Sequence, residues 1–506
     1  MSNVALTSDA GRDAPDKDRG CAWRLATVYV LVVAAVLLAV TAVVHFGSLW
    51  LSPPTAAAIG ETVGAARPMS AHASAGPLSP IATLLLQLLV IISVAHVLSQ
   101  LARRIGQPPV VGEMIAGIAL GPTLFGRIWP EGAAFIFPPA SLGTLQLMSQ
   151  FGVILYLFTV GLNVNVSHLR RRAHVAVAIS HFSIILPFAL GVLAAVGLYG
   201  SYAPADTDFG AFALFIGIAM SVTAFPVLAR ILDDRHLSRT PLGSTALTCA
   251  AVDDITAWAL LAVIIAFVTS GGTMAALLTT VGGSVAFVVL MIYVIQPLLA
   301  ASFGRQQAIF TAPRMSVVLA IMFAAALATE LAGAHALFGA FVAGTIVPAA
   351  GRLRENLRTR LDSLCAVVFL PIFFVFTGLR TEIGMLRDPV SWLVCAGVIL
   401  IAIAGKLLGT MLAARWTGLS WYPAFVLGAL MNTRGLMELI VLNVGLDLGI
   451  LSPRMFTMLV LMALTTTAMT CPLIDAADAL ARRARRRSIR TAGQRTLEAQ
   501  RAARAT

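Results

Sequence analysis

Two adjacent aspartates are the most unusual feature of the sequence. Asp253 and Asp254 lie near the middle of LTCAAVDDITAWALLAVIIAF, which is otherwise uncharged over residues 242–268. A carboxylate at the centre of a bilayer costs at least about 2.5 kcal/mol, so two of them indicate a function or a partner of opposite charge. Two carboxylates this close titrate as a unit. Such a pair can exchange a proton for a small cation, because both compete for the same negative charge.

Helix capping is the alternative explanation for the pair. Asp254 would then cap a helix that begins at Ile255. That explanation requires a helix break in the middle of the membrane, and such a break must itself be lined by protein or water. The pair therefore favours a functional site over a structural cap.

The segment AMSVTAFPVLAR supplies further oxygen ligands. Hard cations prefer carboxylate and carbonyl oxygens, and a partly unwound helix exposes its carbonyl groups. Pro226 lacks an amide and interrupts the helix, while Thr223 offers a hydroxyl. We expect a broken helix here and place Thr223 with Asp253 and Asp254 as ion- and proton-binding residues. A simple proline kink is the alternative.

Lys406 is the candidate counter-charge for the aspartates. It lies in LIAIAGKLLGTMLAARW with apolar residues on both sides, and it is one of only two lysines in the chain. A lysine that extends to the membrane surface is the alternative. The Gly-Lys pair does not end a nucleotide-binding P-loop, because the earlier glycine is missing and Leu407 stands where a Ser or Thr must hold magnesium. The sequence therefore predicts no ATP-driven step and no cofactor.

A second broken helix is expected in LGALMNTRGLMELIVLNVG. Polar residues interrupt this apolar run at Asn432, Thr433, Arg434 and Glu438. Glycine and polar side chains fit a broken helix that pairs with the one at Pro226. Arg434 and Glu438, four residues apart, equally fit an internal ion pair that lets the helix enter the membrane. Both explanations stay open.

Two other polar residues in apolar runs are assigned structural roles. They are Glu113 in VVGEMIAGIALGP and His335 in GAHALFGAFVAG. The glycine spacing around Glu113 favours close helix packing. The five cysteines lack the paired spacing of a zinc site or a disulfide framework.

The composition is that of a polytopic membrane protein. Of 506 residues, 58% are hydrophobic and 11% are charged, whereas a soluble domain has about 25% charged residues. A soluble enzyme and a disordered protein are therefore excluded, and an all-α protein in a lipid membrane is predicted. The formal charge of +12 comes from arginines between apolar segments and near the C-terminus. That pattern is typical of loops facing anionic lipid, so no nucleic-acid partner is expected.

Apolar stretches long enough to cross about 30 Å of hydrocarbon recur along the chain. We expect fourteen, the one at 335–350 being short, at 25–46, 81–101, 109–126, 143–162, 173–199, 209–229, 242–268, 275–300, 315–333, 335–350, 364–380, 390–414, 421–447 and 455–474. Arginines collect in every second loop, which identifies the cytoplasmic side. Both termini fall on that side, in the plasma (inner) membrane.

The predicted organisation has five parts. They are a cytoplasmic segment at 1–24, an extra transmembrane helix at 25–46, an external linker at 47–80, the transmembrane exchanger domain at 81–475 and a basic cytoplasmic tail at 476–506. A signal peptide is the alternative for 25–46. Either explanation leaves the other thirteen helices in the same orientation.

A weak internal repeat links two helix ends. LYLFTVGLNVNVSHLRR from Leu155 and FFVFTGLRTEIGMLRD from Phe373 share Phe-Thr-(x)-Gly-Leu. In the predicted topology they end on opposite sides of the membrane. Such inverted repeats are the signature of secondary transporters, whose substrate site lies at the repeat interface near the midplane.

Taken together, these segments resemble the monovalent cation:proton antiporter-2 family, above all the plant cation/proton exchangers and their bacterial relatives. The motifs, in family order, are GQPPVVGEMIAGIALGPTLFG, SVTAFPVLARIL, AAVDDITAWALL, ALFGAFVAGTIVP, PIFFVFTGL, GKLLGT and MNTRGLMELIVLNVG. The resemblance covers about residues 80–473. It implies the sodium/proton antiporter fold, with a thirteen-helix core, inverted repeats, two crossed broken helices and a homodimer.

The resemblance also implies roles for residues. Asp254 matches the aspartate that binds the transported cation and the proton, Asp253 the residue before it, and Lys406 the lysine that often pairs with it. The plant exchangers typically have Asn at position 253 and Lys at position 434, so stoichiometry is not implied. The nucleotide-binding regulatory domain of glutathione-gated relatives is not expected, because a short basic tail follows the last span.

The hypothesis is therefore a secondary antiporter that exchanges Na⁺ or K⁺ for H⁺ by alternating access, and not an enzyme. A cation channel with the same fold is one alternative. An enzyme that uses the aspartate pair is another, although DDITA and DDRHL lack the DDxxD spacing of a prenyltransferase and no Gly-x-Gly-Asp motif of an intramembrane protease is found.

Overall fold

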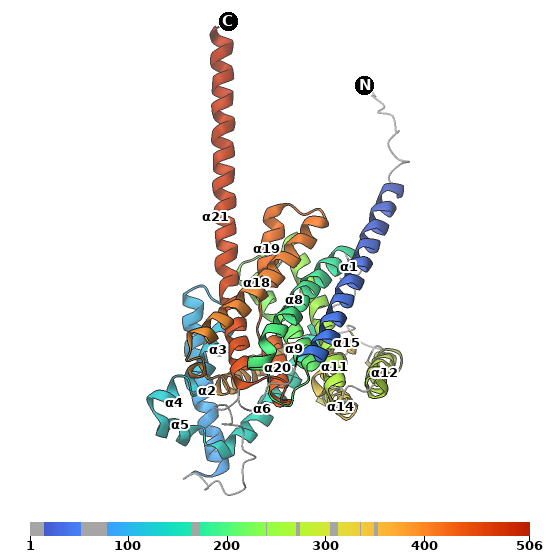
Figure 1. Cartoon of the computed structure of the whole chain (residues 1–506), viewed down its shortest axis with the longest axis vertical. Coiled ribbons are helices and arrows are strands. Elements are labelled where there is room, and N and C mark those ends of the chain that lie inside the picture. Colours follow the sequence, from blue (N-terminus) through green and yellow to red (C-terminus); the bar gives the residue numbers. More distant parts are fainter. Residues whose placement is uncertain are drawn as a thin grey trace.

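The backbone of the molecule is helical wherever it is regular. The computed structural model describes residues 15–51, 78–163, 173–238, 240–269, 274–303, 312–333, 335–348 and 353–505, and no strand occurs among them (Figure 1). Within these ranges, twelve helices are long and apolar enough to cross a membrane, and a bent pair makes a thirteenth span. The shorter helix α15 (Ala336–Ile346) corresponds to the short segment expected at 335–350. The predicted all-helical multi-pass fold is confirmed.

The elements follow the chain as a series of spans. Their bounds are α1 Pro15–Trp50, α2 Pro80–Arg104, α3 Pro109–Leu120, α4 Phe125–Ile128, α5 Pro130–Ile136, α6 Pro139–Asn163, α8 Ala173–Tyr202, α9 Phe209–Ser221, α10 Phe225–Asp234, α11 Pro241–Thr269, α12 Met274–Leu290, α13 Gln296–Phe303, α14 Ala312–Leu331, α16 Leu353–Leu364, α17 Leu370–Leu379, α18 Pro389–Trp416, α19 Trp421–Met431, α20 Leu436–Asp447 and α21 Pro453–Ala505. Many begin with proline, whose missing amide is not needed in the first turn. Asp388 caps α18 by accepting the Ser391 amide at 2.8 Å, and the Ser391 hydrogen bonds hold the pKa of Asp388 below its usual range.

The helices form two groups that pack mainly within themselves. We name α8, α9, α10, α11, α18, α19, α20 and α21 the core bundle, and α2, α3, α6, α14, α15, α16 and α17 the scaffold bundle. The bundles meet where α3 contacts α21 and α17 contacts α20. α12 and α13 connect α11 of the core bundle to α14, and α1 packs on α8 and α9.

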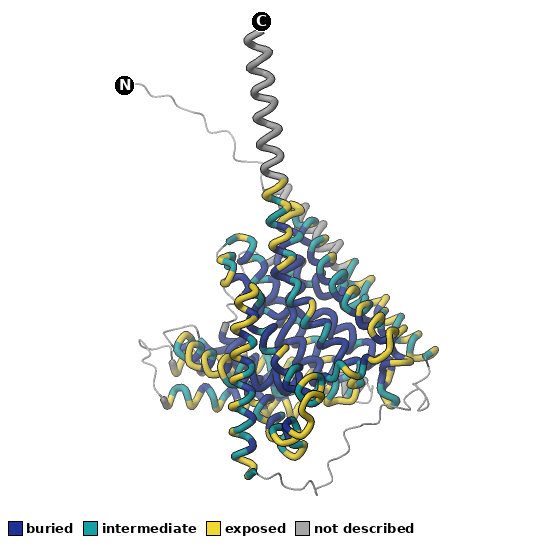
Figure 2. Tube along the Cα trace, turned by 90° about the vertical axis from the view of Figure 1, so that its left-hand side faces the viewer, coloured by how far each residue is buried: buried dark blue, intermediate teal, exposed yellow. Residues whose placement is uncertain are grey.

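The outer surface is apolar and the centre is buried. Figure 2 shows the buried residues gathered in the middle of the helices and the exposed ones around the outside. Large apolar side chains such as Leu38, Leu89 and Leu393 are more than half exposed. Lipid, and not water, is the solvent that such a surface fits.

The two glycines of the predicted repeat have the same packing role. A Cβ atom on Gly161 of α6 would lie 2.3 Å from the Phe341 carbonyl oxygen in α15. A Cβ atom on Gly378 of α17 would lie 2.0 Å from the Gly117 carbonyl carbon in α3. Each Phe-Thr-(x)-Gly-Leu motif therefore brings its helix into backbone contact with a neighbour, as small residues do in membrane bundles.

Both ends of the chain differ from the expected organisation in their helix lengths. α1 begins at Pro15 and not near 25, and α21 continues through the expected tail to Ala505. The tail is rich in Ala and Arg, which are strong helix formers, and it has no proline that would end the helix after the membrane span. The N-terminal end of α1 and the C-terminal end of α21 lie on the same side of the molecule (Figure 1). Residues 1–14 and 52–77 of the predicted segments lie outside the described residues, as do some of the loop arginines on which the predicted topology rests, among them Arg170 to Arg172 and Arg239.

Candidate functional site

Two broken helices cross at the centre of the core bundle. α9 ends at Ser221 and α10 begins at Phe225, while α19 ends at Met431 and α20 begins at Leu436 at an angle of 42° to it. The breaks are bonded to each other, because the Ala224 amide donates to the Thr433 carbonyl at 3.0 Å. Four helix ends, whose last amides and carbonyls lack partners within their own helices, therefore meet inside the protein.

Asp253 and Lys406 form a buried ion pair beside this crossing. Lys406 Nζ lies 3.0 Å from Asp253 Oδ2, and both side chains have no exposed surface. The ammonium also donates to the Ser221 carbonyl at 2.6 Å. Because Ser221 is the last residue of α9, the lysine also places a positive charge at a helix C-terminus, where the helix dipole favours it.

Hydroxyl groups complete the surroundings of Asp253. Ser183 of α8 donates to Oδ2 at 2.8 Å, Thr223 donates to the same oxygen at 2.7 Å, and Ser180 donates to Oδ1. The Thr223 hydroxyl also lies 3.1 Å from the Met431 carbonyl oxygen in the second break. Asp253 is thus hydrogen-bonded on both oxygens and paired, which is what a buried carboxylate requires.

Asp254, the next residue of α11, lacks the hydrogen bonds that surround Asp253. The residue is 2% exposed, and neither carboxylate oxygen has a hydrogen bond of good geometry among the described residues. The backbone of Phe225, the first residue of α10, interacts with it, but that interaction alone does not offset the burial of a charge, so this group favours a bound proton or cation. Tyr156 of α6 lies within electrostatic range of it across the gap between the bundles.

Arg434 and Glu438 form a second buried ion pair, with 2.9 Å between Nη1 and Oε2. Arg434 also donates to the carbonyls of Ala219, at 2.6 Å, and of Met220. Its side chain therefore bonds the carbonyls at the end of α9, opposite α20. The geometry agrees with the predicted internal ion pair between these two residues. Arg434 also links the two broken helices, because it bonds carbonyls of α9.

The remaining predicted residues of the breaks have distinct positions. Pro226 is the second residue of α10, where its missing amide is no loss. The Thr433 hydroxyl lies 3.3 Å from that of Thr470 in α21. Asn432 is fully buried, and neither its amide oxygen nor its amide nitrogen has a partner among the described residues. Orphaned polar atoms of this kind fit a site that binds an ion.

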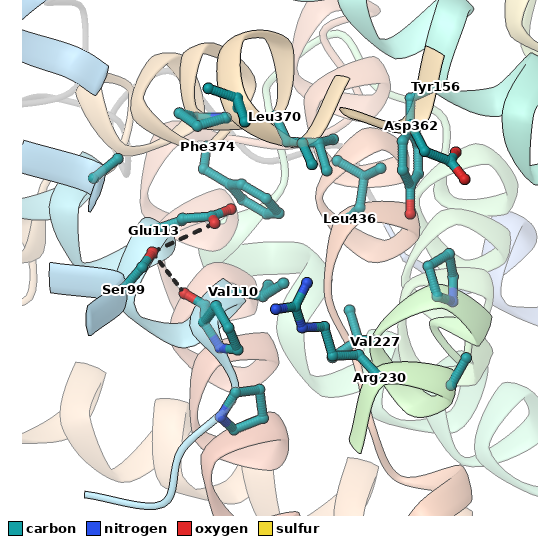
Figure 3. Close-up of a pocket in the computed structure, with 18 of the residues that line it drawn as sticks. Ser99, Val110, Glu113, Tyr156, Val227, Arg230, Asp362, Leu370, Phe374 and Leu436 are labelled. Carbon is teal, nitrogen blue, oxygen red and sulfur yellow. Dashed lines mark hydrogen bonds between the residues drawn. The ribbon is translucent and has the colours of Figure 1, made fainter. Parts of the chain in front are cut away.

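A cavity of about 930 Å³ leads toward the crossing (Figure 3). Its walls include Phe225 and Pro226 at the first break and Tyr156 on the scaffold side. Arg103 and Arg230 also line it, so it opens on the side predicted to be cytoplasmic.

The opposite side is closed by bonds between the bundles. Arg380, at the end of α17, pairs with Asp447 of α20 at 2.5 Å and donates to Asn443 Oδ1 at 3.0 Å. Asn443 Nδ2 in turn donates to Thr377 Oγ1 at 2.8 Å. The core and scaffold bundles are therefore tied together on one side and separated by the cavity on the other.

Sequence reasoning missed four hydroxyl residues of the site. Ser180 and Ser183 bond Asp253, and the Thr467 hydroxyl bonds both the amide and the carbonyl of Arg434, at 3.1 and 2.6 Å. Thr470 is the fourth. A signal existed, because Ser180 and Ser183 lie three residues apart on an apolar helix and thus share a face.

Comparisons with known proteins agree with this fold. Residues 87–475 match the family model described as sodium/hydrogen exchanger, transmembrane. The chain is 44% identical to the Na(+)/H(+) antiporter NhaS4 of Synechocystis sp. over 77% of its length and 96% of that protein. It is 38% identical to Cation/H(+) antiporter 17 of Arabidopsis thaliana over 77% of its length, and it spans about half of that relative, 48%.

A solved structure shares the architecture. The sodium proton antiporter MjNhaP1 from Methanocaldococcus jannaschii aligns with a TM-score of 0.57 at 15% identity, over 79% of this chain and 98% of that one. At this identity the likeness shows the fold alone. Because the family model and a 44% identical relative both cover most of the chain, this multi-pass membrane protein belongs to the sodium/hydrogen exchanger family.

Proposed function

We propose that the protein is a secondary active antiporter that exchanges Na⁺ or K⁺ for H⁺ across the membrane. The observation that carries this proposal is the unpartnered, buried carboxylate of Asp254 at the crossing of the two broken helices. A proton and a monovalent cation each neutralise this group, and the two exclude each other. Occupation by one ligand therefore requires release of the other, which is the chemical basis of exchange.

Alternating access follows from the arrangement of the two bundles. In the observed state the cavity connects the predicted cytoplasmic side with the first break, while the Arg380–Asp447 pair closes the other side. Movement of the core bundle against the scaffold bundle would carry Asp254 to the opposite side. Two copies joined through the scaffold bundles, as expected for a homodimer, would hold those bundles still.

Lys406 is assigned the role of keeping Asp253 charged. The ammonium and three hydroxyls fully satisfy that carboxylate, so in this state the exchanging ligand binds at Asp254. The pair also contributes to the coupling of cation and proton movement if cation binding draws Asp253 away from Lys406. The ammonium group of Lys406 then loses the negative charge that stabilises it. Transport, and not catalysis, is the proposed activity.

The test uses purified protein in proteoliposomes that hold a pH gradient. Addition of Na⁺ or K⁺ should collapse the gradient in the wild type, and the cation that does so identifies the substrate. Cation flux that does not depend on a pH gradient would instead indicate a channel. The absence of any cation-dependent proton movement would refute the proposal.

A further inference from the structure

The scaffold wall of the cavity carries a carboxylate that the proposed exchange does not use. Glu113 of α3 points into the cavity, opposite Arg230 of α10 (Figure 3). Within the part of the chain that the structure describes, its carboxylate accepts one hydrogen bond, a long one of 3.4 Å from the Ser99 hydroxyl. No ion pair within 4.0 Å involves Glu113 among the same residues. The sequence suggested a packing role, but a residue needed only for packing would not direct a charge into a cavity.

Three kinds of oxygen come together at this place. The Ser99 hydroxyl of α2 lies 3.2 Å from the Pro109 carbonyl oxygen as well as 3.4 Å from Glu113 Oε1. A carboxylate, a hydroxyl and a backbone carbonyl are the ligands that hard cations prefer. Because α3 packs mainly against α2 and α17, these oxygens are positioned by the scaffold bundle.

The charges around the cavity favour weak cation binding at this wall. Its lining contains four carboxylates and three guanidinium groups, which are Glu113, Asp233, Asp234, Asp362, Arg103, Arg230 and Arg358, together with His96. Asp233 and Asp234 are exposed at the mouth, whereas Glu113 is half-buried. Arg230 and Arg103 lie within electrostatic range of Glu113, so they weaken cation binding without forming an ion pair. A transport pathway needs such weak sites, from which the ion can leave again.

We propose that Glu113, the Ser99 hydroxyl and the Pro109 carbonyl form a second site for a monovalent cation, which the ion occupies on its way between the cytoplasmic side and Asp254. The proposal rests on the antiport function proposed above and extends it to a residue of the static bundle. This site concentrates the cation beside the first break, so it sets the apparent affinity of transport and not its maximal rate.

Transport kinetics test this division of roles. In proteoliposomes, Glu113→Gln should raise the KM for the cation about fivefold, the loss of about 1 kcal/mol of attraction, and leave the maximal rate within about twofold. Ser99→Ala should raise KM less, and Glu113→Asp should restore much of the affinity. Asp234→Asn is the matched control, because it removes the same charge from the exposed mouth of the same cavity and should leave KM unchanged. An equal effect of the control, or a lower maximal rate with unchanged KM, would refute the site.

A binding measurement separates this inference from the antiport proposal. Purified Asp254→Asn protein should still be stabilised against heat by Na⁺ or K⁺ relative to choline, because the second site remains. The stabilisation should disappear in the double variant Asp254→Asn/Glu113→Gln. Equal stabilisation of both variants would overturn the second site even if antiport is confirmed, and loss only in the double variant would support it even if antiport is not.

Discussion

The Lys406 ammonium lies 3.0 Å from the Asp253 carboxylate, while Asp254, the next residue, has no hydrogen-bond partner for either carboxylate oxygen among the described residues. Two chemically identical neighbours thus have opposite surroundings. Asp253 is bonded on both oxygens, whereas Asp254 is left with room for a ligand. This difference is the basis of the proposal that a single carboxylate, Asp254, alternates between a proton and a cation.

The Asp253–Lys406 pair should matter strongly for folding. Lys406→Ala leaves Asp253 buried without its counter-charge, which should cost about 3 to 5 kcal/mol of stability. The double variant Asp253→Asn/Lys406→Met should recover much of this loss, because no buried charge remains. Melting temperatures of the purified proteins in detergent measure both changes.

The Arg235–Asp475 pair offers the control for that experiment. Its side chains are 26% and 61% exposed, so Arg235→Gln should cost at most about 1 kcal/mol. If Lys406→Ala lowered the melting temperature no more than Arg235→Gln, the Asp253–Lys406 pair would not have the structural role assigned to it.

Both the shape and the charge of Arg434 should matter for stability. Arg434→Lys keeps the charge beside Glu438 but cannot reach the Ala219 and Met220 carbonyls in the same geometry. Arg434→Met loses the charge as well, so it should destabilise the protein clearly more. Thermal unfolding of the two variants gives the order, and equal melting temperatures would contradict the assigned role of the ion pair.

The pH dependence of transport should show competition between the proton and the cation for one site. Under the proposal that proton and cation bind the same Asp254 carboxylate, each fall of one pH unit below the apparent pKa of the site should raise the cation KM about tenfold by mass action. Saturating cation should restore the rate. Initial rates over a matrix of pH and cation concentration measure this, and a maximal rate that falls while KM stays constant would argue against a shared site.

The Arg380–Asp447 pair should keep the side opposite the cavity closed. Arg380→Gln removes a bond between α17 and α20, so the bundles should separate more often on that side. A cysteine introduced at the buried position Thr457, whose hydroxyl accepts the Glu382 amide at 3.3 Å, should then react faster with a membrane-impermeant thiol reagent. Cys249, Cys365, Cys395 and Cys471 are buried, and the protein without Thr457→Cys gives the labelling background. Unchanged labelling would show that other contacts close this side.

The membrane spans could be predicted because apolar length is a direct property of the sequence. The breaks could also be predicted, since Pro226 and the polar run at Asn432 are incompatible with a continuous apolar helix. The contacts between distant segments could not be predicted from the sequence. Nothing local indicates that Ser183 would reach Asp253, or that Arg434 would bond the end of α9, because both depend on how the helices cross.

The Glu113 carboxylate illustrates the same limit. Its neighbours in sequence are glycines and apolar residues that suit packing, and only the tertiary arrangement reveals a cavity in front of it. The continuation of α21 to Ala505 was missed for a different reason, because it depends on local helix propensity and not on tertiary contacts. The alanines and arginines of the tail favour a helix, but a basic composition is equally typical of an irregular cytoplasmic tail.

The most direct test of the central claim is cation-driven proton movement by Asp254→Asn protein in proteoliposomes, with Asp234→Asn as the control. Asparagine has nearly the same shape but can bind neither a proton nor a cation by charge. The account predicts that Asp234→Asn exchanges like the wild type and that Asp254→Asn, though folded, does not exchange at all. Retained exchange by folded Asp254→Asn protein would contradict the assignment of Asp254 as the group that alternates between proton and cation.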